Sequence, residues 1–386
     1  MGSQEAGTGG ATVAEDVLDT TSAGPIAARG GALRAGAYAG STLLGLLSAP
    51  LMIRHLGVAD FGRYVTVLAL VAVIAGVTEG GVAAIAMREY AARSGADRVT
   101  ALRALLGIRL VLTFAGLAIG VAFAIVAGYS PVLVVGTLAA GIALLLQSLQ
   151  ALLSSALQSE LRFGWISGLE LVRQALFVAV VILLVVVGGN LELFFFAQIP
   201  AFLVVLAITA VLVRRLMPLR PSFHVRRSMS LLRDTVAYAA AVALSAMYFR
   251  IAVVALSLLA SERATGYFGT ALRVMEVLIG LPLLVIGAAF PILARASRDD
   301  RARLDSATGR LVEVSLVLGV WFALVVAVAA GPIITLLAGA DFGPSVDLLR
   351  ILAVALIASF VTVACGYALL SLRAHRAILV ADGIAL

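Results

Sequence analysis

Apolar runs of about 20 residues alternate with short polar loops along the chain. Six runs precede a long basic loop, at about 35–53, 64–87, 105–127, 131–157, 167–187 and 191–213. Four runs follow it, at about 235–260, 269–293, 311–330 and 346–372. A helix of roughly 20 apolar residues crosses about 30 Å of hydrocarbon. The pattern therefore predicts an all-α polytopic membrane protein with ten spans.

The basic loop, Arg214–Asp234, holds six arginines, two prolines and a histidine, so it belongs in water at a membrane face. It divides the chain into two helix bundles, which we expect to be pseudo-symmetric. We predict a disordered cytoplasmic tail at 1–30, a six-helix bundle at 31–213, the linker at 214–234 and a second bundle at 235–386. Because 374–386 reads as the start of an eleventh span, we expect the second bundle, of about four to five helices, to be truncated.

The arginines predict the orientation. One set of alternate loops carries most of them, whereas the other set holds only Arg54, Arg63 and Arg263. Loops rich in basic residues stay on the cytoplasmic side, which places the N-terminus in the cytoplasm. The usage of Arg, Ala and Val is typical of a GC-rich bacterial genome, so we expect a bacterial plasma membrane.

Composition narrows the function classes. Hydrophobic residues make up 62% of the 386 residues and charged residues 13%, with a mean hydropathy of +1.11. The net charge is +7, but the arginines lie in short loops as topology signals, so we expect no nucleic acid partner. The chain contains no lysine and no HExxH, GxSxG or CxxC motif. We therefore expect a protein that is not an enzyme and has no cofactor and no metal site.

Several ionisable residues fall inside the predicted spans. A charge at the bilayer centre costs at least about 2.5–3.5 kcal/mol, so such residues face a polar cavity or each other. At about 1.5 Å per residue, Arg250 lies about 24 Å from the cytoplasmic face and Arg273 about 9 Å from the outer one. We predict that five arginines line a cationic substrate-binding cavity: Arg34, Arg109, Arg173, Arg250 and Arg273.

Other interpretations of these residues are open. Glu170 with Arg173, and Arg273 with Glu276, are spaced i,i+3 and could neutralise each other on one helix. Arg109 could extend toward the interface, and Arg34 could act as a topology signal. Arg250 has no acidic residue within a helical turn in the sequence.

The charges favour a particular ligand chemistry. A guanidinium group is always protonated and binds phosphate oxygens through paired N–H groups, so an arginine-lined cavity suits a phosphate or diphosphate headgroup. The intramembrane carboxylates are candidates for coupling to H⁺ or Na⁺: Glu79, Glu170 and Glu276.

The two halves also resemble each other. Gly62 with Tyr64 at the mouth of the second span matches Gly266 with Phe268 at the mouth of the eighth. Both pairs fall on the same predicted membrane side, which indicates a parallel repeat about an axis along the membrane normal.

Three segments resemble a known family. RHLGVADFGRY and MREYAARSG, after the first and second spans, resemble the start of the polysaccharide repeat-unit flippases. These form the Wzx-like branch of the multidrug/oligosaccharidyl-lipid/polysaccharide (MOP) exporter superfamily. ATGYFGTALRVMEVLIGLPLLVIGAAFPILAR resembles spans seven and eight of that family, and LLAGADFGPSVDLLRILA resembles its loop before span ten.

The resemblance implies two six-helix bundles around a cationic cavity. It further implies alternating access that carries an undecaprenyl-pyrophosphate-linked oligosaccharide from the inner to the outer leaflet, with membrane lipids as further partners. Family members usually have about twelve to fourteen spans, so ten and a fragment is a departure. The alternatives are a MATE-like drug exporter of the same superfamily, which would favour an acidic, aromatic-lined pocket, and an inactive truncated membrane scaffold.

Overall fold

The computed structural model describes residues 23–79, 82–160, 162–217, 220–223, 250–287 and 301–371. These residues are mainly helical, and none of them forms a strand. Seven helices among them are long and apolar enough to cross a membrane. The predicted all-α, multi-pass class is therefore confirmed. The predicted tail up to residue 22, the second half of the basic loop, the start of span seven and the eleventh span lie outside the described residues.

Helix α1 (Ala23–Glu79) carries the first two predicted spans. The helix is broken at Gly57, whose φ of 70° and ψ of −179° are not helical, and glycine adopts this positive φ without a Cβ clash. The single stretch Gly40–Thr78 counted among the seven therefore corresponds to two spans. The helix also begins inside the segment predicted to be a disordered tail.

The second predicted span, 64–87, covers the end of α1 and the start of the next described helix, α2 (Val82–Ala92). The two residues between these helices lie outside the described part of the structure.

The remaining helices of the first half contain the predicted spans, although the first of them begins ten residues before the predicted 105. They are α3 (Gly95–Val126), α4 (Pro131–Ser159), α5 (Phe163–Val186), α6 (Leu191–Phe196) and α7 (Gln198–Val213). The sixth predicted span, 191–213, is one continuous stretch that includes α6 and α7, since Ala197 between them keeps helical φ and ψ of −58° and −26°.

The second half contributes helices on the other side of α1. They are the helix Arg250–Leu259, α10 (Glu262–Gly287), α12 (Arg301–Ala338), the 3-10 turn η2 (Ala340–Phe342) and α13 (Ser345–Ser371). α12 extends beyond the predicted 311–330 at both ends, with the polar residues 301–310 before the predicted span and the apolar residues 331–338 after it.

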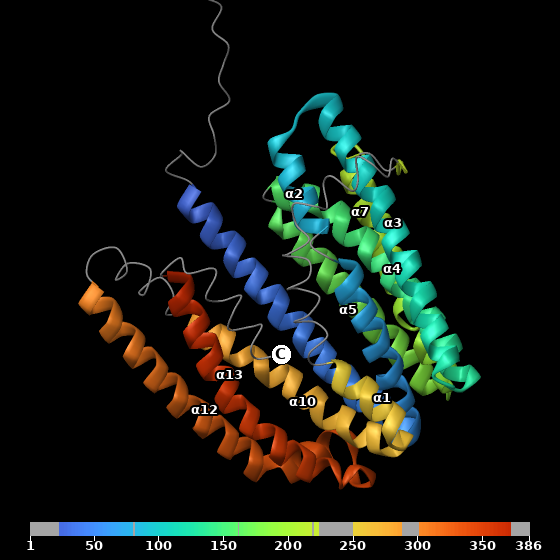
Figure 1. Ribbon diagram of the computed structural model, residues 1–386, viewed down its shortest axis with the longest axis vertical. Helices are drawn as coiled ribbons and strands as arrows, with labels where there is room; N and C mark the ends of the chain where they lie inside the picture. Colours follow the sequence, from blue (N-terminus) through green and yellow to red (C-terminus); the bar gives the residue numbers. More distant parts are fainter. Residues whose placement is uncertain are drawn as a thin grey trace, which may run out of the picture.

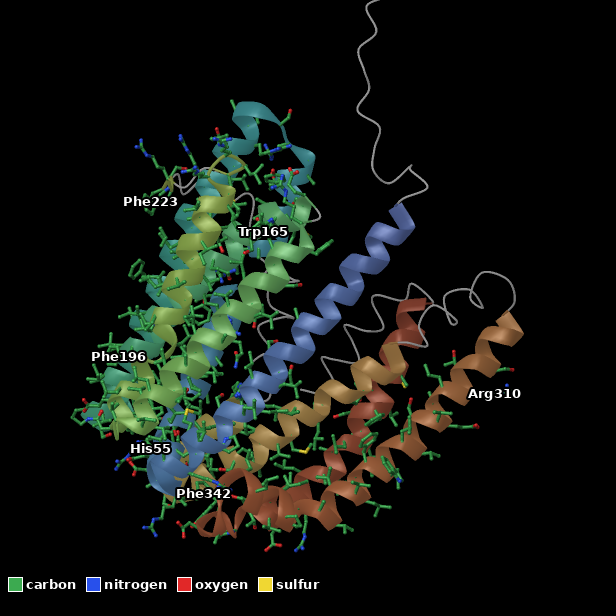
Figure 2. The ribbon with its side chains drawn as sticks, turned by 180° about the vertical axis from the view of Figure 1, so that it is seen from behind. His55, Trp165, Phe196, Phe223, Arg310 and Phe342 are labelled. Carbon is green, nitrogen blue, oxygen red and sulfur yellow. The ribbon has the colours of Figure 1, made fainter. Side chains whose placement is uncertain are left out.

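The two groups of helices meet at one end and diverge toward the other (Figure 1). α1 runs between them and packs against both α5 and α10. Figure 2 places His55 and Phe342 at the end where the groups meet, and Trp165, Phe223 and Arg310 at the opposite end. One hydrophobic core at the meeting end includes Phe61 from α1, Phe194 from α6 and Phe342 from η2.

The second half of α1 crosses α10 at the two repeated glycines. A Cβ atom on Gly62 would lie 2.0 Å from the carbonyl oxygen of Glu262, and one on Gly266 would lie 2.1 Å from that of Val58. The two contacts are reciprocal, as expected where equivalent segments meet at a two-fold axis. Only glycine permits this approach, so the glycines that mark the sequence repeat also form the junction of its two copies.

Candidate substrate cavity

A cavity of about 770 Å³, which we call the main cavity, opens between helices from both halves. α1 lines it with residues between Ser41 and Pro50, and α10 with residues between Arg273 and Leu278. α5 contributes Glu170 and Gln174, and α12 contributes an apolar wall of Ile333, Leu336 and Leu337. Polar and charged groups are thus confined to α1, α5 and α10, while the wall from α12 is apolar.

A second, smaller hollow of about 130 Å³ adjoins the main cavity, and we call it the inner pocket. Arg250 and Gln198 line it, together with aromatic side chains of α1 and α5 that include Tyr64 and Phe177. Arg273 and Glu276 line both hollows. The side chains of these two residues therefore lie where the main cavity and the inner pocket meet.

Glu276 joins two of the predicted arginines. Its Oε1 atom lies 2.7 Å from Nη1 of Arg250, and its Oε2 atom lies 3.1 Å from Nη1 of Arg273. The Arg273 contact is the i,i+3 pair considered from the sequence, whereas the Arg250 contact is tertiary. Arg250 has no acidic neighbour along the chain, but the fold supplies one from α10.

Arg173 pairs with Glu170, as the i,i+3 spacing allowed. Its Nε donates to Oε2 of Glu170 at 3.0 Å, and its Nη2 also bonds that carboxylate. The Arg173 guanidinium additionally lies over the ring of Phe202, 5.3 Å from its centroid. Glu170 lines the main cavity, so this pair forms part of the α5 wall.

Arg109 lies apart from both hollows. It is 2% exposed, and its Nη1 donates to the carbonyl oxygen of Thr78 at 2.9 Å, near the end of α1. The structure thus places Arg109 inside the first bundle, where it caps a helix end. The side chains of Arg34 and Glu79 lie outside the described part of the structure.

Three arginines and two glutamates accordingly meet at or beside the two hollows: Arg173, Arg250, Arg273, Glu170 and Glu276. Their formal charges leave one excess positive charge. The site is therefore less cationic than the sequence alone predicted, because carboxylates neutralise most of its arginines. Among the described residues, no group of three His, Cys, Asp or Glu side chains could hold a metal ion.

Polar contacts join the two halves where the helix groups meet. Nη2 of Arg54 on α1 donates to the carbonyl oxygens of Thr335 and Leu336 on α12, at 3.1 and 2.7 Å. Nε of Arg63 lies 2.8 Å from Oε1 of Glu262 on α10. The sequence predicts that both arginines lie in outside loops. These contacts, together with the glycine crossing, close this end of the molecule.

Comparison with known proteins identifies the family. Residues 51–347 match a family model described as "Polysaccharide biosynthesis protein". The chain belongs to this polysaccharide biosynthesis family. A comparison with curated proteins finds no match.

Solved structures with the same fold are membrane transporters of the MOP superfamily. An inward-facing multidrug resistance MATE family transporter matches with a TM-score of 0.69 and 14% identity, covering 89% of this chain and 83% of its own. The lipid II flippase MurJ, in an inward closed conformation, matches with a TM-score of 0.73 and 16% identity, covering 91% and 78%. A MOP superfamily transporter from Pyrococcus furiosus matches with a TM-score of 0.59 and 16% identity, covering 92% of this chain and 84% of its own. At these identities the likeness shows that this chain has the fold of these transporters.

The cavity of this polysaccharide biosynthesis family member contains residues that sequence reasoning missed. Ser41 and Thr42 on α1 and Gln174 on α5 add neutral hydrogen-bonding groups to its lining. In the sequence, only Gln174 carries a sign of this location, because it directly follows Arg173 and lies one helical turn after Glu170. Uncharged polar residues are common in membrane helices, so this signal alone is weak.

Proposed function

We propose that this protein moves a diphosphate-linked lipid oligosaccharide from the inner to the outer leaflet of a bacterial plasma membrane by alternating access. The observation that carries the proposal is the convergence of Arg250 and Arg273 on one carboxylate beside a large hollow between the two helix bundles. Membership of a polysaccharide biosynthesis family supports the same class of substrate.

The polar and apolar parts of the cavity lining both support this substrate. Guanidinium groups bind phosphate oxygens in pairs, so Arg250 and Arg273 suit a diphosphate group. Ser41, Thr42 and Gln174 offer hydrogen bonds to sugar hydroxyl groups, and the apolar wall from α12 suits the first part of a lipid chain. A cavity of about 770 Å³ is large enough to take more than the diphosphate alone.

The orientation belongs to the same proposal. The end where the helix groups diverge carries Trp165 and Arg310, both in loops or helix ends predicted to face the cytoplasm (Figure 2). With the N-terminus cytoplasmic, the protein would be open toward the inner leaflet and closed at the outer face. Glu170 and Glu276 are the described carboxylates available to couple transport to H⁺ or Na⁺.

The test is export of a surface glycan by cells that depend on this protein. We expect Arg250→Ala and Arg273→Ala to reduce export at least tenfold at unchanged protein abundance, because each removes a fixed phosphate-binding cation. Arg310→Ala, which removes an exposed arginine in the N-terminal part of α12, is the matched control. Normal glycan in both cavity variants would end the proposal.

A drug exporter is the second candidate function, because the apolar wall and the two carboxylates also suit a cationic amphiphile. That function predicts resistance to cationic dyes, which Glu170→Gln or Glu276→Gln would abolish. A non-transporting scaffold predicts that none of these variants changes glycan or dye resistance.

A further inference from the structure

We infer that the inner pocket is a phosphate subsite whose arginines are held by the Glu276 carboxylate until a phosphate group displaces it. The inference rests on the proposed function and deepens it, since it names the residue that substrate must replace. Glu276 thereby becomes an exchangeable counter-ion of the cavity.

The three side chains of the ion-pair network line different hollows. Arg250 lines the inner pocket and is absent from the described lining of the main cavity, whereas Arg273 and Glu276 line both. A ligand in the main cavity therefore reaches Arg273 first. The Glu276 carboxylate bonds both arginines, so it occupies the place between them that a bridging anion would take.

The contacts of Glu276 resemble those of a bound oxyanion. Its two oxygens lie on two guanidinium groups from different helices, at 2.7 and 3.1 Å. Phosphate oxygens make the same charge-assisted bonds to arginine and are more numerous and more highly charged. The Tyr64 hydroxyl group and the Gln198 amide group also line the inner pocket and offer donors that a third phosphate oxygen could use.

The carboxylate and the phosphate cannot share the arginines. A phosphate bound to Arg250 and Arg273 would place like charges in contact, which costs binding free energy in a site of low dielectric constant. Glu276 has room to leave, because it also lines the main cavity and its side chain is 26% exposed. Binding is therefore an exchange of one anion for another, and the return of Glu276 promotes release.

The test measures binding of inorganic pyrophosphate to the purified full chain by equilibrium dialysis. Removing the competing charge in Glu276→Gln is expected to tighten binding on the order of tenfold, as for the loss of one charged hydrogen-bond competitor. Glu276→Asp, whose shorter side chain reaches the two arginines less well, is expected to give a smaller gain. Glu313→Gln, at an exposed position of α12, is the control and is expected to match the wild type.

A second arm uses farnesyl diphosphate in the same detergent, which separates a free phosphate from a lipid headgroup as the source of the anion. Tighter binding of either probe by Glu276→Gln supports the subsite if the gain is lost in the double variant that also carries Arg250→Ala. Equal binding by the wild type and both Glu276 variants would overturn the subsite and leave the proposed function standing. If no variant binds either probe, the proposed function fails as well.

Discussion

Gly62 and Gly266 lie against each other's helix, each facing a backbone carbonyl oxygen of the opposite half. The Gly62 position meets the oxygen of Glu262, and the Gly266 position meets the oxygen of Val58. Because backbone atoms cannot rotate away as a side chain would, this junction fixes the distance between the second half of α1 and α10. Alternating access would require the two bundles to rock about such a fixed crossing.

Gly62→Ala is expected to destabilise the protein, because its Cβ atom would lie 2.0 Å from the Glu262 oxygen. Overpacking costs about 1–3 kcal/mol, and a backbone obstacle places this variant at the upper end. Thermal unfolding of the purified protein measures the effect. Gly331→Ala in α12, where a Cβ meets nothing within 4 Å, is the control and is expected to be neutral or stabilising. Unfolding of Gly62→Ala at the wild-type temperature would show that the crossing is looser than the structure indicates.

Arg54→Ala is expected to loosen the closed end. The variant removes the donor to the carbonyl oxygens of Thr335 and Leu336, which lie at the C-terminal end of α12, and leaves the Thr335 oxygen only the Gly339 N–H at 3.1 Å. A cysteine at buried Ala338, in a chain carrying Cys365→Ala, would then react several-fold faster with a maleimide because opening exposes it.

Arg350→Ala is the control for that experiment. The Arg350 ion pair with Asp347 lies within α13, so its loss leaves the junction between the halves intact. Equal labelling rates in the Arg54 and Arg350 variants would contradict a closing role for Arg54.

Arg250 and Glu276 are expected to be energetically coupled. A double-mutant cycle with Arg250→Ala and Glu276→Ala should give a coupling free energy of about 0.5–3 kcal/mol in thermal unfolding, as for residues in one ion-pair network. The exposed pair Arg350 and Asp347 is the comparison, with about 0.2–1 kcal/mol expected. A coupling at Arg250 and Glu276 no larger than that of the exposed pair would contradict a cavity-lining network.

Tyr90, on the short helix α2, is expected to titrate late. Burial raises the pKa of its phenol to about 12, and its hydrogen bond to Oε1 of Glu160 at 2.8 Å acts in the same direction. The raised pKa means that the folded state holds the proton more tightly than the unfolded one. The associated stability is fully present below about pH 10 and is lost as the pH rises toward 12.

The absorbance of the phenolate measures this titration. The difference between the wild type and Tyr90→Phe should contain one component near pH 12. A difference component near pH 10, the ordinary value for tyrosine, would show that Tyr90 is solvated.

The sequence predicted the membrane helices well because hydrocarbon thickness sets a length that an apolar run either has or lacks. α4, α5 and α13 fall close to their predicted ranges. The errors lie where a helix continues past its apolar run into polar sequence. α3 begins ten residues before the predicted 105, and α12 is helical from ten residues before the predicted 311, because hydropathy marks the apolar part of a helix and not its polar ends.

By itself the sequence determined the all-α membrane class and the i,i+3 spacing that allows Arg173 and Arg273 to pair with glutamates, because each depends on composition or on neighbours within a few residues. It also indicated the repeat marked by Gly62 and Gly266. Only the tertiary structure decided that Arg250 meets Glu276 and that Arg109 caps the Thr78 carbonyl inside one bundle. Charges far apart in sequence acquire partners only when helices pack, and in a low-dielectric interior those partners determine how much charge remains for a substrate.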